Sequence, residues 1–115
     1  MLISINTLFI HVNMYVILNR IKKILKEIVP LSTVILFGSH ARKEANEESD
    51  IDLMVILKQD TVSRKEEKDI LSHLYGIEFE TGKIISPIII TENDWQKASL
   101  KTTFYHEVMK ERIVL

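Results

Sequence analysis

The fold of this chain is decided by residues 33–57, which read TVILFGSHARKEANEESDIDLMVIL. The stretch begins and ends with two apolar runs, Thr33–Phe37 and Ile51–Leu57, whose β-branched and aromatic residues predict two buried strands. Beyond its first residues the second run is apolar on both faces, which is typical of a central strand. The connection between the runs is short for a parallel crossover, so a parallel, an antiparallel and a mixed sheet all remain open.

Gly38 and Ser39 follow the first predicted strand and form a turn that suits a phosphate group. Glycine has no Cβ, so the backbone can approach phosphate oxygens closely. Ser39 adds a hydroxyl and is expected to cap a short helix through about Lys43, whose free N–H groups would favour an anion. Arg42 lies one helical turn after Ser39, and its planar guanidinium matches phosphate geometry.

Asp50 and Asp52 open the second predicted strand. Side chains alternate along a strand, so both carboxylates point the same way, with Cα atoms roughly 7 Å apart. Mg²⁺ is typically bound by one or two carboxylates together with substrate phosphates. Two such ions roughly 4 Å apart can hold an attacking oxygen and a leaving pyrophosphate. A Gly-Ser turn or an Asp-x-Asp pair alone is usually structural, but together they predict a metal-dependent enzyme that handles a nucleoside triphosphate.

The remaining segments predict further helices and one more strand. Apolar spacing and breakers place helices at 16–29, 63–81 and from Thr91, a strand at 83–90, and a short helix with an apolar strand over 103–115. Pro87 inside the third strand indicates a sheet edge or a bulge. Residues 1–13 are apolar but too short for a membrane span and lack the features of a signal peptide. They are expected to form an extra strand or an irregular arm.

Size and composition fit one domain over residues 1–115, of α+β class, with a small mixed sheet and helices packed mainly on one face. The net charge of −1 gives no basic field, so nucleic acid is not an expected partner, and no membrane partner is expected either. There is no cysteine, which excludes disulfides and thiolate metal sites and fits a cytoplasmic setting.

The stretch Val34–Leu57 resembles the nucleotidyltransferase superfamily related to DNA polymerase beta. It is most similar to the minimal nucleotidyltransferase branch, which includes kanamycin-nucleotidyltransferase-like domains and the antitoxins paired with HEPN toxins. The resemblance implies transfer of a nucleoside monophosphate, commonly AMP from ATP or another NTP, to a hydroxyl, with two Mg²⁺ ions and release of pyrophosphate. The candidate catalytic and metal-binding residues are Asp50 and Asp52, and the candidate nucleotide-binding residues are Gly38, Ser39, Arg42 and Ser49.

The chain departs from the family pattern at a third carboxylate, which often lies on a neighbouring strand as a metal ligand or general base. The matching strand, residues 84–90, contains no acid, and Ser86 or Pro87 stands near the expected position. Glu78 and Glu80 lie just before it, at the end of a helix, where solvated side chains are the simpler interpretation. His40, in the turn, either lines the phosphate pocket or lies on the surface.

The chain has little room for a second, acceptor-binding domain, so the acceptor is expected to be a partner protein, of HEPN type by resemblance. Alternatively, a second subunit of a homo-oligomer is expected to supply the missing half. Two other functions remain open. A degenerate module would bind nucleotide or a partner without turnover, which the missing third carboxylate favours and the intact Asp50 and Asp52 oppose. A nucleotidyltransferase for small, aminoglycoside-like molecules would be completed by dimerisation.

Overall fold

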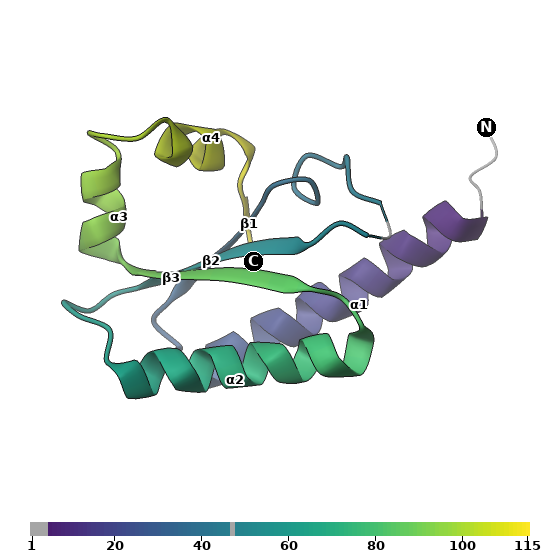
Figure 1. Cartoon of the computed structure of the whole chain (residues 1–115), viewed down its shortest axis with the longest axis horizontal. Helices are drawn as coiled ribbons and strands as arrows, with labels where there is room; N and C mark the ends of the chain where they lie inside the picture. The colour runs from purple at the N-terminus through teal and green to yellow at the C-terminus, as the bar shows by residue number, and fades with distance from the viewer. Residues whose placement is uncertain (1–4, 47) are drawn as a thin grey trace.

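The computed structural model describes residues 5–46 and 48–115, with side chains from Met14 onward. Within these residues, four helices and four strands follow one another in the order α1, β1, β2, α2, β3, α3, α4, β4 (Figure 1). Their bounds are α1 Ile5–Ile28, β1 Thr33–Phe37, β2 Ile51–Leu57, α2 Arg64–Thr81, β3 Ile85–Thr91, α3 Glu92–Ala98, α4 Thr103–Glu111 and β4 Ile113–Val114. The α+β class and the mixed sheet predicted from the sequence are confirmed.

The strands form one sheet in the order β3-β2-β1-β4. β1 and β2 pair antiparallel, with Phe37 opposite Asp52, which answers the open question about their pairing. β2 and β3 pair parallel, with Asp52 opposite Ser86, because α2 carries the chain back across the sheet between them. β3 lies at the edge of the sheet, as the proline at position 87 predicted.

The alternation of side chains along the strands gives the sheet two buried faces. Ile51, Leu53 and Val55 pack under α1 and α2, whereas Met54 and Ile56 point to the opposite face, under α3 and α4. Figure 1 shows the two long helices on one side of the sheet and the two short helices on the other. The long helices match the expected main layer, and the short C-terminal helices add a second one.

The first helix begins earlier than predicted. α1 already includes Ile5, so the extra strand or irregular arm expected over residues 1–13 is wrong from Ile5 onward, while residues 1–4 lie outside the described residues. The sequence spacing explains the difference, because Ile10, Met14, Ile17 and Ile21 continue one helical series across the boundary. No helix that the structure describes combines the length and the apolar character needed to cross a bilayer.

Both ends of α2 are capped by the residues that its sequence suggests. Ser63 accepts a hydrogen bond from the Glu66 N–H while the Glu66 side chain accepts from the Ser63 N–H, forming a capping box. Gly82 ends the helix in the left-handed conformation, with φ 73°. These caps fix the position at which β3 begins beside β2.

Gly76 lies within α2, where a Cβ would meet no heavy atom within 4 Å. We expect Gly76→Ala to raise the free energy of unfolding by about 0.5–1 kcal/mol, because alanine loses less backbone entropy in a helix. Urea denaturation of the variant beside the parent chain measures this change. A free energy of unfolding equal to or lower than that of the parent chain would contradict the open environment of Gly76.

Candidate active site

The candidate site lies where the end of β1 meets the start of β2. Gly38 follows β1 with φ 75°, in the left-handed region that favours glycine. A Cβ added there would collide with Oδ2 of Asp52. Only glycine therefore lets the Asp52 carboxylate lie directly against this backbone, which gives the Gly-Ser turn and the Asp pair a physical connection.

The short helix expected after Ser39 is instead a turn. The Arg42 N–H donates to the Gly38 carbonyl at 3.0 Å, and the Glu44 N–H donates to the Ser39 carbonyl at 2.9 Å. Lys43 then takes a positive φ of 60°, so the backbone leaves the helical path after one turn. The short helix expected from Ser39 through about Lys43 was therefore wrong, because the backbone makes a single turn and does not continue as a helix.

The Asp pair forms a concentrated negative site. Burial raises the pKa of Asp52 above its ordinary value of 3.8, and the neighbouring Asp50 raises it further. His40 and Arg42 act in the opposite direction on this pKa, and Glu111 adds to the increase. A half-buried carboxylate that is penalised for its charge fits a divalent cation, since Mg²⁺ would offset both the burial and the repulsion.

The raised pKa of Asp52 predicts that this site costs stability. An aspartate whose pKa rises on folding destabilises the folded chain above that pKa and leaves it unaffected below the ordinary value. In the presence of EDTA near pH 7, we therefore expect Asp52→Asn to increase the free energy of unfolding, by less than about 1 kcal/mol because water partly screens this half-buried side chain. Denaturation at several pH values measures this difference, which should disappear below about pH 3.8. A variant less stable than the parent chain at pH 7 would contradict the burial penalty.

The strand position opposite Asp52 carries no third carboxylate. Ser86 faces Asp52 across the β2–β3 pair, as expected from the sequence. Glu78 accepts a hydrogen bond from the Ile85 N–H at 2.9 Å, and Glu80 forms an exposed ion pair with Arg20. Among the side chains that the structure describes, those of residues 14–46 and 48–115, no three histidine, cysteine or acidic groups lie closely enough together to hold a metal. Any bound ion would therefore take its remaining ligands from the substrate or from water.

Glu111, which the sequence reading missed, reaches this site from the end of α4. The Gly38 N–H donates to its Oε1 at 2.9 Å, and Arg42 Nη1 donates to its Oε2 at 3.0 Å. These two hydrogen bonds, of which that from Arg42 has the larger effect, hold the pKa of Glu111 below its ordinary value. β4 creates this contact, because its pairing of Ile113 with Leu36 brings the preceding residues alongside Gly38.

The other two predicted residues of the loop support its shape. The Ser49 hydroxyl accepts a hydrogen bond from the Asn46 N–H at 2.9 Å. His40 Nε2 lies 3.2 Å from the Ser49 carbonyl and connects the start of the loop to its end. His40 also influences the pKa of Asp52, so it borders the site. Ser49 lies next to Asp50, but its hydroxyl is engaged within the loop.

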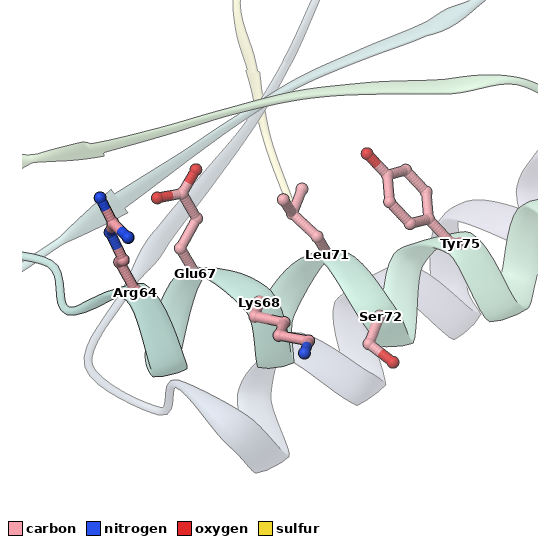
Figure 2. A pocket seen from close by; sticks show the side chains of 6 residues that line it. All are labelled: Arg64, Glu67, Lys68, Leu71, Ser72 and Tyr75. Atoms are coloured by element: carbon pink, nitrogen blue, oxygen red, sulfur yellow. The ribbon is translucent and has the colours of Figure 1, made fainter.

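The outer face of α2 carries a separate hollow of about 430 Å³. Figure 2 shows that all of its lining side chains come from α2. These residues are Arg64, Glu67, Lys68, Leu71, Ser72 and Tyr75. The hollow shares no residue with the loop or the Asp pair, so its lining provides neither a phosphate-binding turn nor a paired carboxylate.

Comparison with known proteins agrees with this geometry. The model of the nucleotidyltransferase domain matches residues 18–115. The chain belongs to the nucleotidyltransferase domain family. This nucleotidyltransferase domain is 37% identical over 89 residues to a protein of Methanocaldococcus jannaschii named "Putative protein adenylyltransferase", covering 76% of this chain and 80% of the relative. A second protein of that organism with the same description is 41% identical over 78 residues, covering 64% of this chain and 80% of the relative.

A solved structure shares the fold of this nucleotidyltransferase domain. A crystal structure described as a toxin-antitoxin with AMP-PNP superposes with a TM-score of 0.59 and 20% identity, over 84% of this chain and 69% of the other. At this identity the superposition shows a common fold. The family match and the fold agree with the resemblance noted in the sequence of residues 34–57. The family match and the adenylyltransferase relatives identify the general reaction as nucleotidyl transfer.

Proposed function

We propose that this nucleotidyltransferase domain transfers AMP from ATP to a hydroxyl group on a partner protein, in a reaction that depends on Mg²⁺. The observation that carries the proposal is the Asp52 carboxylate held against the Gly38 backbone, with Asp50 beside it. This arrangement puts a cation-binding pair next to a phosphate-binding turn. Both are needed when a triphosphate is cleaved between its α- and β-phosphates.

The roles of the individual residues follow from their chemistry. Asp50 and Asp52 would hold Mg²⁺, which when bound neutralises charge developing on the phosphates. The Gly38 N–H, the Ser39 hydroxyl and the Arg42 guanidinium would bind and orient the phosphate oxygens. The acceptor oxygen forms a bond to the α-phosphorus, the bond from that phosphorus to the bridging oxygen breaks, and pyrophosphate leaves. The hydroxyl proton passes to water or to a base on the acceptor, since Ser86 offers no carboxylate.

Three features support a protein as the acceptor. The relatives from Methanocaldococcus jannaschii are described as adenylyltransferases of proteins, and the solved structure with the same fold pairs a toxin with an antitoxin and contains AMP-PNP. The α2 surface of this chain exposes Tyr75 and, almost completely, Phe79, the kind of apolar surface that marks protein interaction sites. A HEPN-type partner fits the resemblance, a homo-oligomer is the alternative, and the absence of cysteine agrees with a cytoplasmic setting.

A specific observation favours a second candidate function. Because Ser86 occupies the position opposite Asp52, the domain lacks an evident general base on the sheet. A module that binds nucleotide or a partner without turnover would need none. The intact Asp pair argues for the catalytic function, since a module without metal chemistry gains nothing from two adjacent carboxylates and loses stability through them.

Labelled ATP tests the two candidates directly. The chain is co-expressed with a HEPN-type protein from a cell that encodes both, and the complex is incubated with Mg²⁺ and ATP labelled at the α-phosphate. Transfer predicts label on the partner protein and release of pyrophosphate. Binding of AMP-PNP without any labelled protein or released pyrophosphate would favour the non-catalytic module and contradict the proposed reaction.

A further inference from the structure

Two hydrogen-bond donors of the turn are already occupied by a side chain of the same molecule. Glu111 accepts from the Gly38 N–H through one carboxylate oxygen and from Arg42 through the other. The Glu111 side chain is only 19% exposed, whereas that of Arg42 is 44% exposed. The carboxylate thus sits inward, between a backbone amide and a guanidinium, in the arrangement that proteins use to bind an oxyanion.

These donors are the ones that the proposed function assigns to the triphosphate, so the following inference rests on that function. A carboxylate and a phosphate both present two oxygens to a guanidinium and compete for the same N–H groups. Asp50, Asp52 and Glu111 together also repel an incoming triphosphate, and Arg42 is the cation closest to Glu111 among the ion pairs of the described residues. A nucleotide can use both donors only after Glu111 leaves them.

The geometry does not make Glu111 the missing third metal ligand. Its two oxygens face Gly38 and Arg42, and no group of three potential ligands forms a metal site among the described residues. Glu111 is the last residue of α4, and β4, which follows it, pairs with the edge of β1 that faces away from β2. The Glu111 side chain therefore reaches Gly38 from the side of β1 opposite β2. Rotation of this side chain would free the Gly38 N–H and Arg42 Nη1, whereas Arg42 Nε would keep its bond to Glu44 Oε2 at 3.0 Å.

We infer that the Glu111 carboxylate is an internal competitor for the phosphate-binding donors of this site. The Glu111 carboxylate accepts from the Gly38 N–H and from Arg42, and a nucleotide that uses these donors must displace it. If the donors are free for about a tenth of the time, the apparent affinity for the nucleotide falls about tenfold. Glu111 therefore sets a threshold for the nucleotide concentration at which the site fills.

Titration calorimetry of the full chain with AMP-PNP and Mg²⁺ tests this inference. Glu111→Ala should lower the Kd about tenfold, because the competing carboxylate is gone. Glu111→Asp keeps the charge but is one methylene too short to bridge both donors, so it should also lower the Kd. An unchanged or increased Kd in Glu111→Ala overturns the inference, since it would mean that Glu111 is neutral or helps Arg42 to bind nucleotide.

Two controls separate this effect from other causes. Glu107→Ala removes an exposed acidic side chain one turn earlier on α4 and should leave the Kd within about twofold of the parent value. A decrease in Kd equal to that of Glu111→Ala would show a general effect of charge and would overturn the inference. Thermal melting confirms that each variant is folded, and Glu111→Asp carries the test if the alanine variant is not. If the parent chain binds AMP-PNP and the Glu111 variants bind it no more tightly, the inferred role of Glu111 is rejected but the proposed function is not. The absence of binding in every chain rejects the proposed function as well.

Discussion

Asp52→Asn is expected to reduce Mg²⁺-dependent nucleotidyl transfer by roughly a hundredfold or more, because a bound ion contributes several kcal/mol to stabilising the developing charge. Asparagine keeps the shape of the side chain but offers a neutral oxygen that holds Mg²⁺ weakly beside Asp50. The measurement is the initial rate of pyrophosphate release from ATP at saturating Mg²⁺. Because burial penalises the charge of Asp52, the variant should remain folded while its activity is lost.

A matched control removes an aspartate elsewhere. Asp60 is exposed in the connection between β2 and α2, beyond the end of β2 that is remote from Asp52. Asp60→Asn changes the net charge by the same amount and should leave the rate unchanged. Full activity in Asp52→Asn would remove the proposed metal site and would leave the turn at Gly38 without its catalytic partner.

Gly38→Ala is expected to lower both stability and activity. The alanine would be strained by the positive φ, and its Cβ would collide with the Asp52 carboxylate. The first effect costs about 1–2 kcal/mol and the second a further 1–3 kcal/mol as the carboxylate is pushed aside. Urea denaturation gives the combined loss. The rate of transfer should fall to about the level of Asp52→Asn, because the displaced carboxylate no longer lies beside the turn.

Gly82 separates these two effects. It has nearly the same φ, 73°, but a Cβ there would meet no heavy atom within 4 Å. Gly82→Ala should therefore show the backbone strain alone, a loss of about 1–2 kcal/mol, with the rate of transfer preserved. Equal losses of stability and activity in both variants would show that contact between Gly38 and Asp52 is unimportant.

The sequence was most informative where function and fold depend on neighbouring residues. The end of β1 at Phe37, the start of β2 at Ile51, the missing Cβ at Gly38 and the two-residue spacing of Asp50 and Asp52 are all local patterns. The antiparallel pairing of β1 with β2 was left open because loop length alone permits more than one geometry. The helix expected after Ser39 failed because a good cap and a one-turn loop begin with the same residues.

The part of the site that the sequence did not predict depends on a distant contact. Glu111 lies 73 residues from Gly38 and belongs to a short helix whose pattern indicates only burial of Val108. The apolar residues after it predicted a strand, but nothing in the pattern specified that this strand pairs with β1. A single glutamate at a helix end is usually solvated, so only the register of β4 shows its role.

The pairing of β4 with β1 also leads us to expect an order in which the site is assembled as the chain folds. The β1–β2 hairpin and its loop are close in sequence, so they can form early, whereas β4 closes a loop from Ile35 to Val114. Contacts with such long loops carry the larger entropic cost and generally form late. Glu111 lies just before β4, so its contacts with Gly38 and Arg42 are expected to form together with this late pairing, after the hairpin itself.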